Sequence, residues 1–303
     1  MAFLKPKDTI AIVSPSGVIT NPENVLNSLK ILKDWNLNVL QGNSIFDKHN
    51  FFSGTDRQRL EDLQNFLDNP QIKAIFFSRG GYGLMRLLPY INLTKFCKYP
   101  KILIGFSDIT SLLIYIYQQT LFPTIHGPML NSFSKYNQND SLNYLYKLLF
   151  IDENIEYNIS TSEYNIHGNS EGTIVGGNLS IIYSLQGTPY EINTHNKILF
   201  IEDVNENIYH IERMLLNLKY SGKFDRLKGL IVGNFINIKD TVPSFGMNVE
   251  EVILNILKNY NFPIIFNFPA GHGNINYPIL LGSKVSIFVN DKISKVIIYN
   301  ENR

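Results

Sequence analysis

Ser107 and Asp108 separate two apolar stretches within "KILIGFSDITSLLIYIY", which runs from Lys101 to Tyr117. A serine at the end of a buried strand can act as a nucleophile when a base activates its hydroxyl. Serine and aspartate are also preferred where a helix begins, because their oxygens accept hydrogen bonds from the N–H groups of the first turn. The local pattern leaves both roles open for Ser107, so residues elsewhere in the chain must decide between them.

Two of the six histidines are candidates for the base that a serine nucleophile needs. His126 in "IHGPM" and His272 in "AGHGN" both stand beside glycine after a predicted strand. Glycine lets the backbone bend close to a ligand at such positions. The other histidines are predicted in polar loops or on the solvent side of a helix. Position in the sequence does not choose between His126 and His272.

A serine and a histidine form a catalytic set when a third group orients the histidine. Glu202 and Asp203 end the predicted strand "KILFIED". Because successive strand residues face opposite sides, one of the two is expected to point toward a site. The alternative is that these acids cap the helix that begins near Asn207, and we favour that role for Asp203.

The glycine turn "SRGGYG", Ser78–Gly83, offers backbone N–H groups with no side chains in the way. Such a turn can bind a developing oxyanion. The N–H of Asp108 at the start of a helix would be one donor, and that of Gly80 or Gly81 the other. The turn could also bind phosphate or simply connect two elements, but its spacing fits neither a dinucleotide fingerprint nor a P-loop. We expect no cofactor, and no metal, because metal-binding motifs such as HExxH are absent from the sequence.

The predicted elements place these residues at equivalent positions. In the first half of the chain, continuous apolar strands alternate with helices such as 21–35 and 55–70, a pattern typical of a parallel sheet covered on both faces. In open parallel sheets, ligands bind at the carboxyl ends of the strands. Ser107, the glycine turn, Glu202 and His272 all follow predicted strands. This shared placement favours chemistry at Ser107.

The chain is long enough for two domains of ordinary size. We predict an N-terminal domain over 1–136 that carries Ser107, a helix and linker over 137–170, and a second α/β domain over 171–303. The linker is assigned from polar text rich in Asn and Tyr, where the periodic pattern weakens.

Composition excludes several classes of protein. The net charge of +1 argues against a nucleic-acid partner, and the single cysteine rules out an internal disulfide. The N-terminal apolar run is too short for a signal peptide or an anchor, and no stretch is long enough to cross a bilayer. We therefore expect a cytoplasmic protein without a membrane partner.

Taken together, the motifs resemble those of the LD-carboxypeptidases, or muramoyltetrapeptide carboxypeptidases. This serine peptidase family also includes the microcin C immunity peptidases. The resemblance covers nearly the whole chain. The segments that carry it are "DTIAIVSPSG", "SRGGYG", "GFSDIT", "HGPM", "EGTIVGGNLSII", "GTPY", "LFIEDVNENIYHIERMLLNL", "GLIVGNF" and "GHGNINYPILLG".

The resemblance implies a Ser–Glu–His triad of Ser107, Glu202 and His272, which settles the choice of base in favour of His272. It also implies a flavodoxin-like parallel-sheet N-terminal domain and a smaller α/β C-terminal domain, with the active site at their interface. Family members are often homodimers, so a homodimer is expected.

The implied reaction is hydrolysis of the L,D bond that releases terminal D-alanine from murein tetrapeptides during cell-wall recycling, by way of an acyl-enzyme. The amides of Asp108 and Gly81, with Gly80 as the alternative to Gly81, would bind the oxyanion. Arg79 and Arg213 are candidates to bind the terminal carboxylate, and Tyr82 is a further candidate to bind the muropeptide.

Two other functions remain open. Microcin C immunity peptidases act on aminoacyl-nucleotide analogues, but they tend to be longer and carry an aromatic loop that stacks the base. The only tryptophan here, Trp35, falls in an early helix, which favours the cell-wall branch. A two-domain chain could also be a non-enzymatic small-molecule binding protein.

Overall fold

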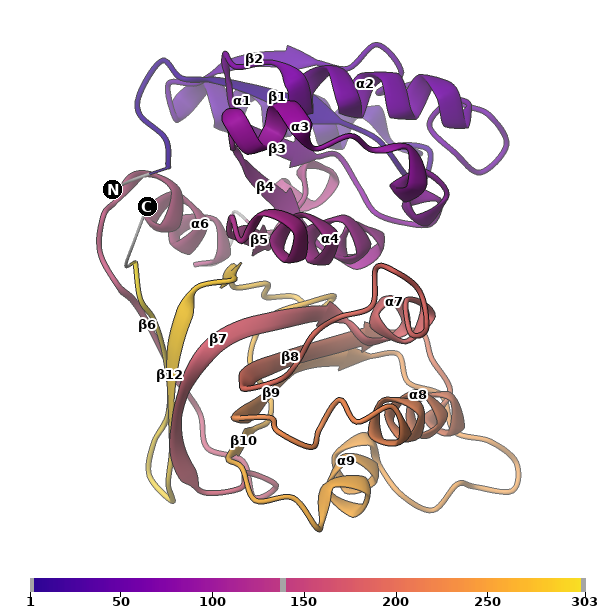
Figure 1. Ribbon diagram of the computed structural model, residues 1–303, viewed down its shortest axis with the longest axis vertical. Coiled ribbons are helices and arrows are strands. Elements are labelled where there is room, and N and C mark those ends of the chain that lie inside the picture. Colours follow the sequence, from indigo (N-terminus) through magenta and orange to yellow (C-terminus); the bar gives the residue numbers. More distant parts are fainter. Residues whose placement is uncertain (1–2, 137–139, 301–303) are drawn as a thin grey trace. The chain divides into compact units, whose positions relative to one another are not determined.

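The computed structural model of the protein describes residues 3–136 and 140–300. The chain forms two compact units, which are described separately. The first comprises Met1–Asp152 and Tyr277–Leu280, and the second comprises Glu153–Asn276 and Leu281–Arg303. Both units combine helices with a largely buried sheet, as the alternating pattern predicted (Figure 1).

The sheet of the first unit has six strands in the order β11-β5-β4-β3-β1-β2. All pairs from β1 to β5 are parallel, and the order 2-1-3-4-5 is that of a flavodoxin-like sheet. β3 and β4 are almost wholly buried, which explains their near-continuous apolar sequences. The strands are β1 (Thr9–Val13), β2 (Asn38–Gln41), β3 (Ile72–Phe77), β4 (Ile102–Gly105), β5 (Thr124–His126) and β11 (Ile279–Leu281).

Two helices of the first unit begin at the residues where local sequence signals place them. Asn21 accepts a hydrogen bond from the backbone of Glu23 at the start of the first helix, with Pro22 in the first turn. Thr55 and Gln58 form the predicted capping box of the second helix. The helices are α1 (Pro22–Asp34), α2 (Asp56–Asp68), α3 (Thr94–Lys98), α4 (Thr110–Thr120), α5 (Phe133–Tyr136) and α6 (Ser141–Phe150). Short 3₁₀ turns are η1 (Leu84–Arg86), η2 (Leu88–Tyr90), η3 (Ser107–Ile109) and η4 (Leu130–Ser132).

The second unit has a seven-stranded mixed sheet in the order β10-β9-β8-β7-β12-β13-β6. β7 to β10 are parallel, whereas β7, β12, β13 and β6 pair antiparallel. The strands are β6 (Ile155–Ile159), β7 (Gly168–Asn178), β8 (Lys197–Val204), β9 (Gly229–Ile236), β10 (Ile264–Ile265), β12 (Lys284–Val289) and β13 (Ser294–Ile298). The helices are α7 (Leu179–Ser184), α8 (Ile208–Tyr220) and α9 (Val249–Leu257).

The segment over 137–170, predicted as a helix and a linker, contains the expected helix α6 but also the strand β6 and the start of β7. In β6, Ile155 and Tyr157 are buried, while Glu156 and Asn158, which follow them in turn, are exposed. β6 is an edge strand that pairs with β13. Because every second residue of this strand is polar, it has no continuous apolar run, and the sequence pattern did not predict it as a strand.

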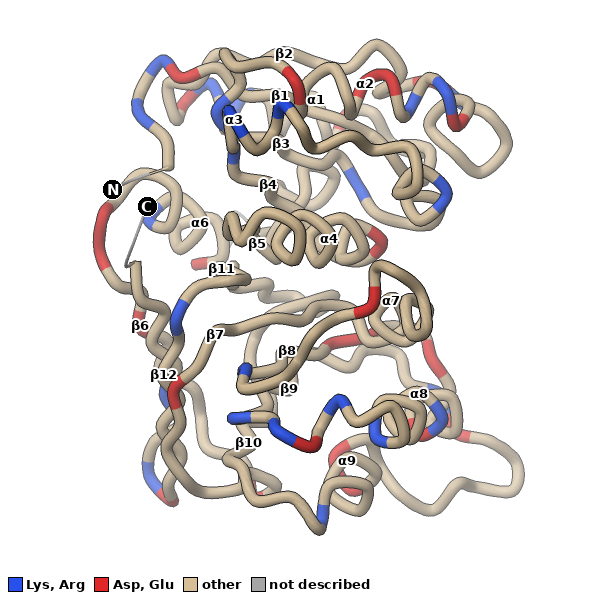
Figure 2. The backbone as a smooth tube through the Cα atoms, viewed as in Figure 1, with Lys and Arg blue, Asp and Glu red and all other residues tan. Residues whose placement is uncertain are grey.

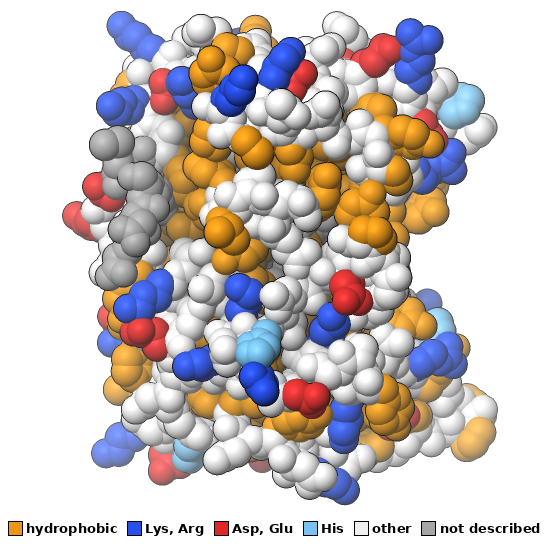
Figure 3. Space-filling view, viewed as in Figure 1, with side chains coloured by type: hydrophobic (Ala, Val, Ile, Leu, Met, Phe, Trp, Pro, Cys, Tyr) orange, Lys and Arg blue, Asp and Glu red, His pale blue; other side chains and the backbone are white. Residues whose placement is uncertain are grey.

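Charged residues are spread over the chain. Lys and Arg (blue) and Asp and Glu (red) are both found in each of the two units (Figure 2). On the face drawn in Figure 3, basic side chains are interspersed with acidic and uncharged ones. The totals nearly cancel, which gives the chain a net charge of +1. Among the described residues, no helix combines the length and apolar character needed to cross a membrane.

Candidate active site

Ser107 directly follows the carboxyl end of β4 and opens η3, which continues into α4. Its backbone φ of +62° lies in the left-handed region, where residues other than glycine are uncommon. Backbone strain of this kind persists where the surrounding structure holds it, and it clusters at functional sites. No side-chain hydrogen bond caps η3 or α4, so the capping role considered for Ser107 is not found. The structure therefore favours a functional reason for serine at this position.

Gly80 lies against the Ser107 side chain. A Cβ atom on Gly80 would come within 2.9 Å of Ser107 Oγ and 3.4 Å of the Asp108 backbone nitrogen. Its neighbour Gly81 has a φ of +109°, and a Cβ there would lie 3.3 Å from Gly17 Cα. The glycine turn after β3 thus approaches Ser107 as closely as backbone allows, and a side chain at residue 80 would occupy the space beside the hydroxyl.

The Asp108 side chain forms hydrogen bonds with two neighbouring segments, the turn after β1 and the start of η1. It is 1% exposed, and its Oδ2 accepts hydrogen bonds from Ser16 Oγ at 2.6 Å and from the Leu84 N–H at 2.9 Å. Ser16 follows β1, and Leu84 opens η1. Burial raises the pKa of Asp108, while these hydrogen bonds oppose the shift. Asp108 therefore holds the turn after β1 and the start of η1 in place around Ser107.

In the second unit, Glu202 and His272 form a hydrogen-bonded pair. Glu202 is fully buried near the carboxyl end of β8, and its Oε2 lies 2.7 Å from His272 Nδ1. The same oxygen accepts a hydrogen bond from the His272 backbone N–H at 3.2 Å. Because an ionised carboxylate only accepts hydrogen bonds, the proton of the neutral ring lies on Nδ1, which makes Nε2 an acceptor. The His272 side chain is 20% exposed. The pair thus presents an oriented base.

Glycine on each side of His272 is needed for this geometry. Gly271 has a φ of +104°, and a Cβ on it would lie 2.4 Å from Glu202 Oε2. A Cβ on Gly273 would lie 2.3 Å from Asn234 Nδ2. The "AGHGN" motif therefore brings the backbone within contact of Glu202 and of β9. His126, the other candidate for the base, is fully buried in the first unit and packs edge-on against the ring of Phe106.

Asp203 caps a helix, but not the one predicted: it caps α7 and not α8. Asp203 Oδ2 accepts a hydrogen bond from the Ser180 N–H at 2.8 Å, in the first turn of α7, and Oδ1 accepts one from Asn178 Nδ2 at 3.0 Å. The helix that follows Asn207 has no side-chain cap. The reason is non-local: β7 and β8 are neighbours, with Asn178 opposite Glu202. Burial, with the nearby Glu202 carboxylate, raises the pKa of Asp203 to about 7.

The three residues predicted to bind substrate differ in their surroundings. Arg79 is half-buried, and its Nη1 donates to the Val18 carbonyl at 2.6 Å. Tyr82 is 54% exposed beside the Phe52 ring, and Arg213 is exposed and lies over the ring of its helix neighbour Tyr209.

The sequence did not point to two further residues that lie near the candidate residues, one in each unit. Phe51 is 54% exposed, and its ring lies 3.7 Å from a Cβ placed on Gly81. Nothing in its loop sequence marks it. Asn178 is 4% exposed and donates to both Glu202 and Asp203. Its signal was an Asn directly before an apolar helical run, the mark of a helix cap.

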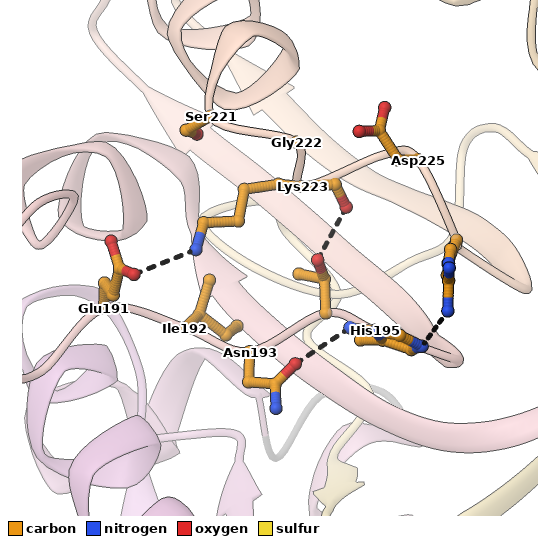
Figure 4. A pocket seen from close by; sticks show the side chains of 10 residues that line it. Glu191, Ile192, Asn193, His195, Ser221, Gly222, Lys223 and Asp225 are labelled. Atoms are coloured by element: carbon orange, nitrogen blue, oxygen red, sulfur yellow. Dashed lines mark hydrogen bonds and ion pairs between the residues drawn. The ribbon is translucent and has the colours of Figure 1, made fainter.

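The described residues of the second unit line at least two cavities. One of about 360 Å³ lies at the carboxyl end of β9 and is lined in part by Asn234, which neighbours Gly273. A larger one of about 660 Å³ lies before the first residues of β8 and β9, at the opposite end of β8 from Glu202 (Figure 4). Its charged groups already contact one another: Lys223 lies 3.5 Å from Glu191, and Arg226 lies 3.3 Å from His195. We assign no ligand to this larger cavity.

Both units are similar in sequence to known proteins of one family. The model of the LD-carboxypeptidase N-terminal domain matches residues 10–127, and that of the LD-carboxypeptidase C-terminal domain matches residues 171–287. The chain is 32% identical to a probable murein peptide carboxypeptidase of Bacillus subtilis, over 96% of this chain and 94% of that one.

Solved structures give the same picture. The muramoyltetrapeptide carboxypeptidase from Oxalobacter formigenes superposes with a TM-score of 0.86 at 26% identity, covering 96% of this chain and 98% of the other. An MccF-like protein from Bacillus anthracis also reaches 0.86 at 26% identity, covering 98% of both chains. The similarity thus extends over both units at the level of sequence and of fold. The chain belongs to the LD-carboxypeptidase family.

Proposed function

We propose that this protein is a serine LD-carboxypeptidase that releases the terminal D-alanine of murein tetrapeptides, with Ser107, His272 and Glu202 as its catalytic triad. The observation that carries the proposal is the 2.7 Å contact between Glu202 and His272, which leaves Nε2 as the proton-accepting nitrogen. Family membership and the names of the Bacillus subtilis and Oxalobacter formigenes relatives support the substrate class.

The proposed reaction begins when His272 Nε2 takes the proton of Ser107 and the serine oxygen attacks the carbonyl carbon of the L,D bond. Glu202 stabilises the imidazolium that forms. The oxyanion accepts hydrogen bonds from the backbone N–H groups of Asp108 and Gly81, with Gly80 as the alternative to Gly81. His272 then gives its proton to the amine of D-alanine, which leaves. In the second half of the reaction, His272 Nε2 takes a proton from water and the water oxygen attacks the carbonyl of the acyl-enzyme. The ester bond then breaks, the proton passes from His272 to Ser107 Oγ, and the shortened peptide leaves as its carboxylate.

Gly80 and Asp108 support the serine in this scheme. The absence of a side chain at residue 80 keeps open the space next to Ser107 Oγ, where the reacting carbonyl must enter. The first backbone N–H groups of a helical segment carry partial positive charge, and Asp108 stands in the first turn after β4. A negatively charged oxygen in that space would therefore be stabilised.

The released group carries a terminal carboxylate, which needs a cationic or N–H partner. We propose Arg79 as that partner, with Arg213 as the alternative and Tyr82 as a contact to the rest of the peptide. Arg79 directly precedes Gly80, and its guanidinium contacts the Val18 carbonyl through Nη1. Arg213 is exposed on α8 and lies over Tyr209.

Replacing Arg79 by methionine is expected to raise KM for the tetrapeptide about 10- to 100-fold, because a hydrogen bond to a charged group contributes about 1.5–3 kcal/mol. kcat should change less than KM. The measurement is the initial rate of D-alanine release over a range of substrate concentrations. Arg57→Gln is the control, since Arg57 is exposed and pairs with Glu61 on α2. An increase in KM for Arg213→Met and not for Arg79→Met would move the role to Arg213.

A second candidate function is hydrolysis of aminoacyl-nucleotide analogues, favoured by the similarity to the MccF-like protein of Bacillus anthracis. The test compares two substrates with the same purified protein: a diaminopimelate-containing tetrapeptide and an aminoacyl sulfamoyl adenosine. We expect D-alanine from the first and little cleavage of the second. The reverse result would favour the second candidate, and cleavage of neither would favour a binding protein.

We further propose that the protein works in the cytoplasm in cell-wall recycling, and that it is a homodimer. A dimer would have twice the chain mass of 34.7 kDa. Light scattering during size-exclusion chromatography measures this directly. A mass of one chain at micromolar concentration would contradict the dimer without affecting the proposed reaction.

A further inference from the structure

Asp203 is buried and contacts groups other than His272. It is 1% exposed, next to the fully buried Glu202, and two adjacent carboxylates in a buried site repel each other. Three donors surround Asp203: Asn178 Nδ2 at 3.0 Å, and the backbone N–H groups of Ser180 and Val204, each at 2.8 Å. Asp203 therefore contacts the first turn of α7 and also, through Asn178, the surroundings of Glu202.

Asn178 connects the two carboxylates. Its Nδ2 donates to Asp203 Oδ1 at 3.0 Å and to Glu202 Oε1 at 3.3 Å. Its Oδ1 accepts hydrogen bonds from Ser180 Oγ at 2.7 Å and from the Ile181 N–H at 3.2 Å. The amide is therefore fixed at both ends: the oxygen faces the first turn of α7, and the NH₂ group faces the acids.

This arrangement restricts the rotation of the Glu202 carboxylate. Its Oε2 contacts the ring and the backbone of His272, while its Oε1 accepts from Asn178. If Asn178 turned its oxygen toward Glu202, two acceptors would face each other and the carboxylate would be pushed out of line with the ring. Asp203 opposes that turn, because its Oδ1 accepts from Asn178 and from the Val204 N–H and would then face a second acceptor.

We propose that Asp203 is a positioning residue, which sets the orientation of Asn178 and through it holds Glu202 in line with His272. The inference rests on the proposed function for its effect on catalysis. Its effect on the Glu202–His272 hydrogen bond does not depend on what the enzyme hydrolyses.

Asp203→Leu tests the inference, because leucine keeps a branched side chain and accepts no hydrogen bond. The Asn178 NH₂ group then has no acceptor at position 203, and the amide can move away from Glu202. We expect kcat for D-alanine release to fall about 10- to 100-fold, the range for loss of a hydrogen bond to a charged group, with KM within about twofold. A kcat within about twofold of the wild type would overturn the proposal.

Asp203→Asn is the matched variant that separates positioning from capping. Its amide oxygen can take the place of Oδ1 and still accept from Asn178 and from the Val204 N–H, while its NH₂ group loses the hydrogen bond from Ser180. We expect thermal stability to fall in both variants, and kcat to stay within about twofold of the wild type in Asp203→Asn only. Equal losses of kcat in the two variants would assign Asp203 a capping role only and overturn the proposal.

A readout independent of activity is the proton on His272 Nδ1, which a strong hydrogen bond to Glu202 moves far downfield in the ¹H NMR spectrum. The signal is assigned by its absence in His272→Gln. We expect it in the wild type and in the control Asp225→Asn, a surface position that accepts from Tyr260 OH. It should shift or broaden away in Asp203→Leu and stay in place in Asp203→Asn. An unchanged signal would overturn the inference even if the substrate proved to be different, whereas a missing tetrapeptide activity in the wild type would count only against the proposed function.

Discussion

Replacing Ser107 by alanine is expected to abolish D-alanine release, lowering kcat by at least about 10⁴-fold, as loss of a serine nucleophile does in other serine hydrolases. The adjacent glycine turn cannot replace the hydroxyl, because Gly80 and Gly81 carry no side chain. Substrate binding should change little, since the methyl group of alanine fits where the serine Cβ stands. The measurement is single-turnover and steady-state release of D-alanine from a purified tetrapeptide.

Covalent labelling tests the same residue without a peptide substrate. A fluorophosphonate should modify one serine per chain, and mass spectrometry of the digested protein should place the label on Ser107. Ser132→Ala is a suitable control, because Ser132 is a half-buried serine in η4 and its replacement should leave both rate and labelling unchanged. Retained activity in Ser107→Ala would reduce this residue to a structural part of the strand end and remove the basis of the proposed triad.

The elements that sequence patterns predicted correctly are those fixed by neighbours along the chain. The start of α1 at Asn21 and the capping box of Thr55 and Gln58 each depend on residues within one turn. The buried strands of the first unit could be predicted from their continuous apolar runs. Features that depend on contacts between segments distant in the sequence were not predicted by these local patterns. β11, formed by Ile279–Leu281, completes the sheet of the first unit, although it lies far beyond β5 in the sequence.

The candidate site shows the same division. The candidate residues could be predicted because each follows a predicted strand. Local sequence did not show which side chains they contact. The choice between His126 and His272 was open on local grounds and depended on a family resemblance. In the structure, His272 contacts Glu202 while His126 is buried beside Phe106. Asp203 was expected to cap α8, the helix that follows it in sequence. It caps α7 instead, the helix that follows the neighbouring strand β7. The order of strands in a sheet, which local sequence does not encode, decides both outcomes.

Replacing Glu202 by glutamine is expected to lower kcat about 10³- to 10⁴-fold with little change in KM, an effect comparable to the loss of the acid in other triads. The reason lies in the two ends of the side chain. Glu202 accepts at both oxygens, from His272 at one and from Asn178 at the other. A glutamine has one acceptor and one donor group, so it satisfies only one of these partners.

Both orientations of a glutamine at position 202 are unfavourable. With its oxygen toward His272, its NH₂ group meets the NH₂ group of Asn178, which is held in place by Asp203 and by the first turn of α7. With its NH₂ group toward His272, the glutamine forces the proton of the ring onto Nε2, where the imidazole can no longer take a proton from serine. Because the side chain at this position is fully buried, water cannot supply the missing partner.

The rate of D-alanine release should therefore fall steeply in Glu202→Gln but not in Glu171→Gln, whose carboxylate is exposed and pairs with Lys284. Steady-state kinetics of the two variants, each compared with the wild type, measure the difference. Near-normal kcat in Glu202→Gln would mean that His272 is oriented without this carboxylate, and the acid would have to be removed from the proposed triad.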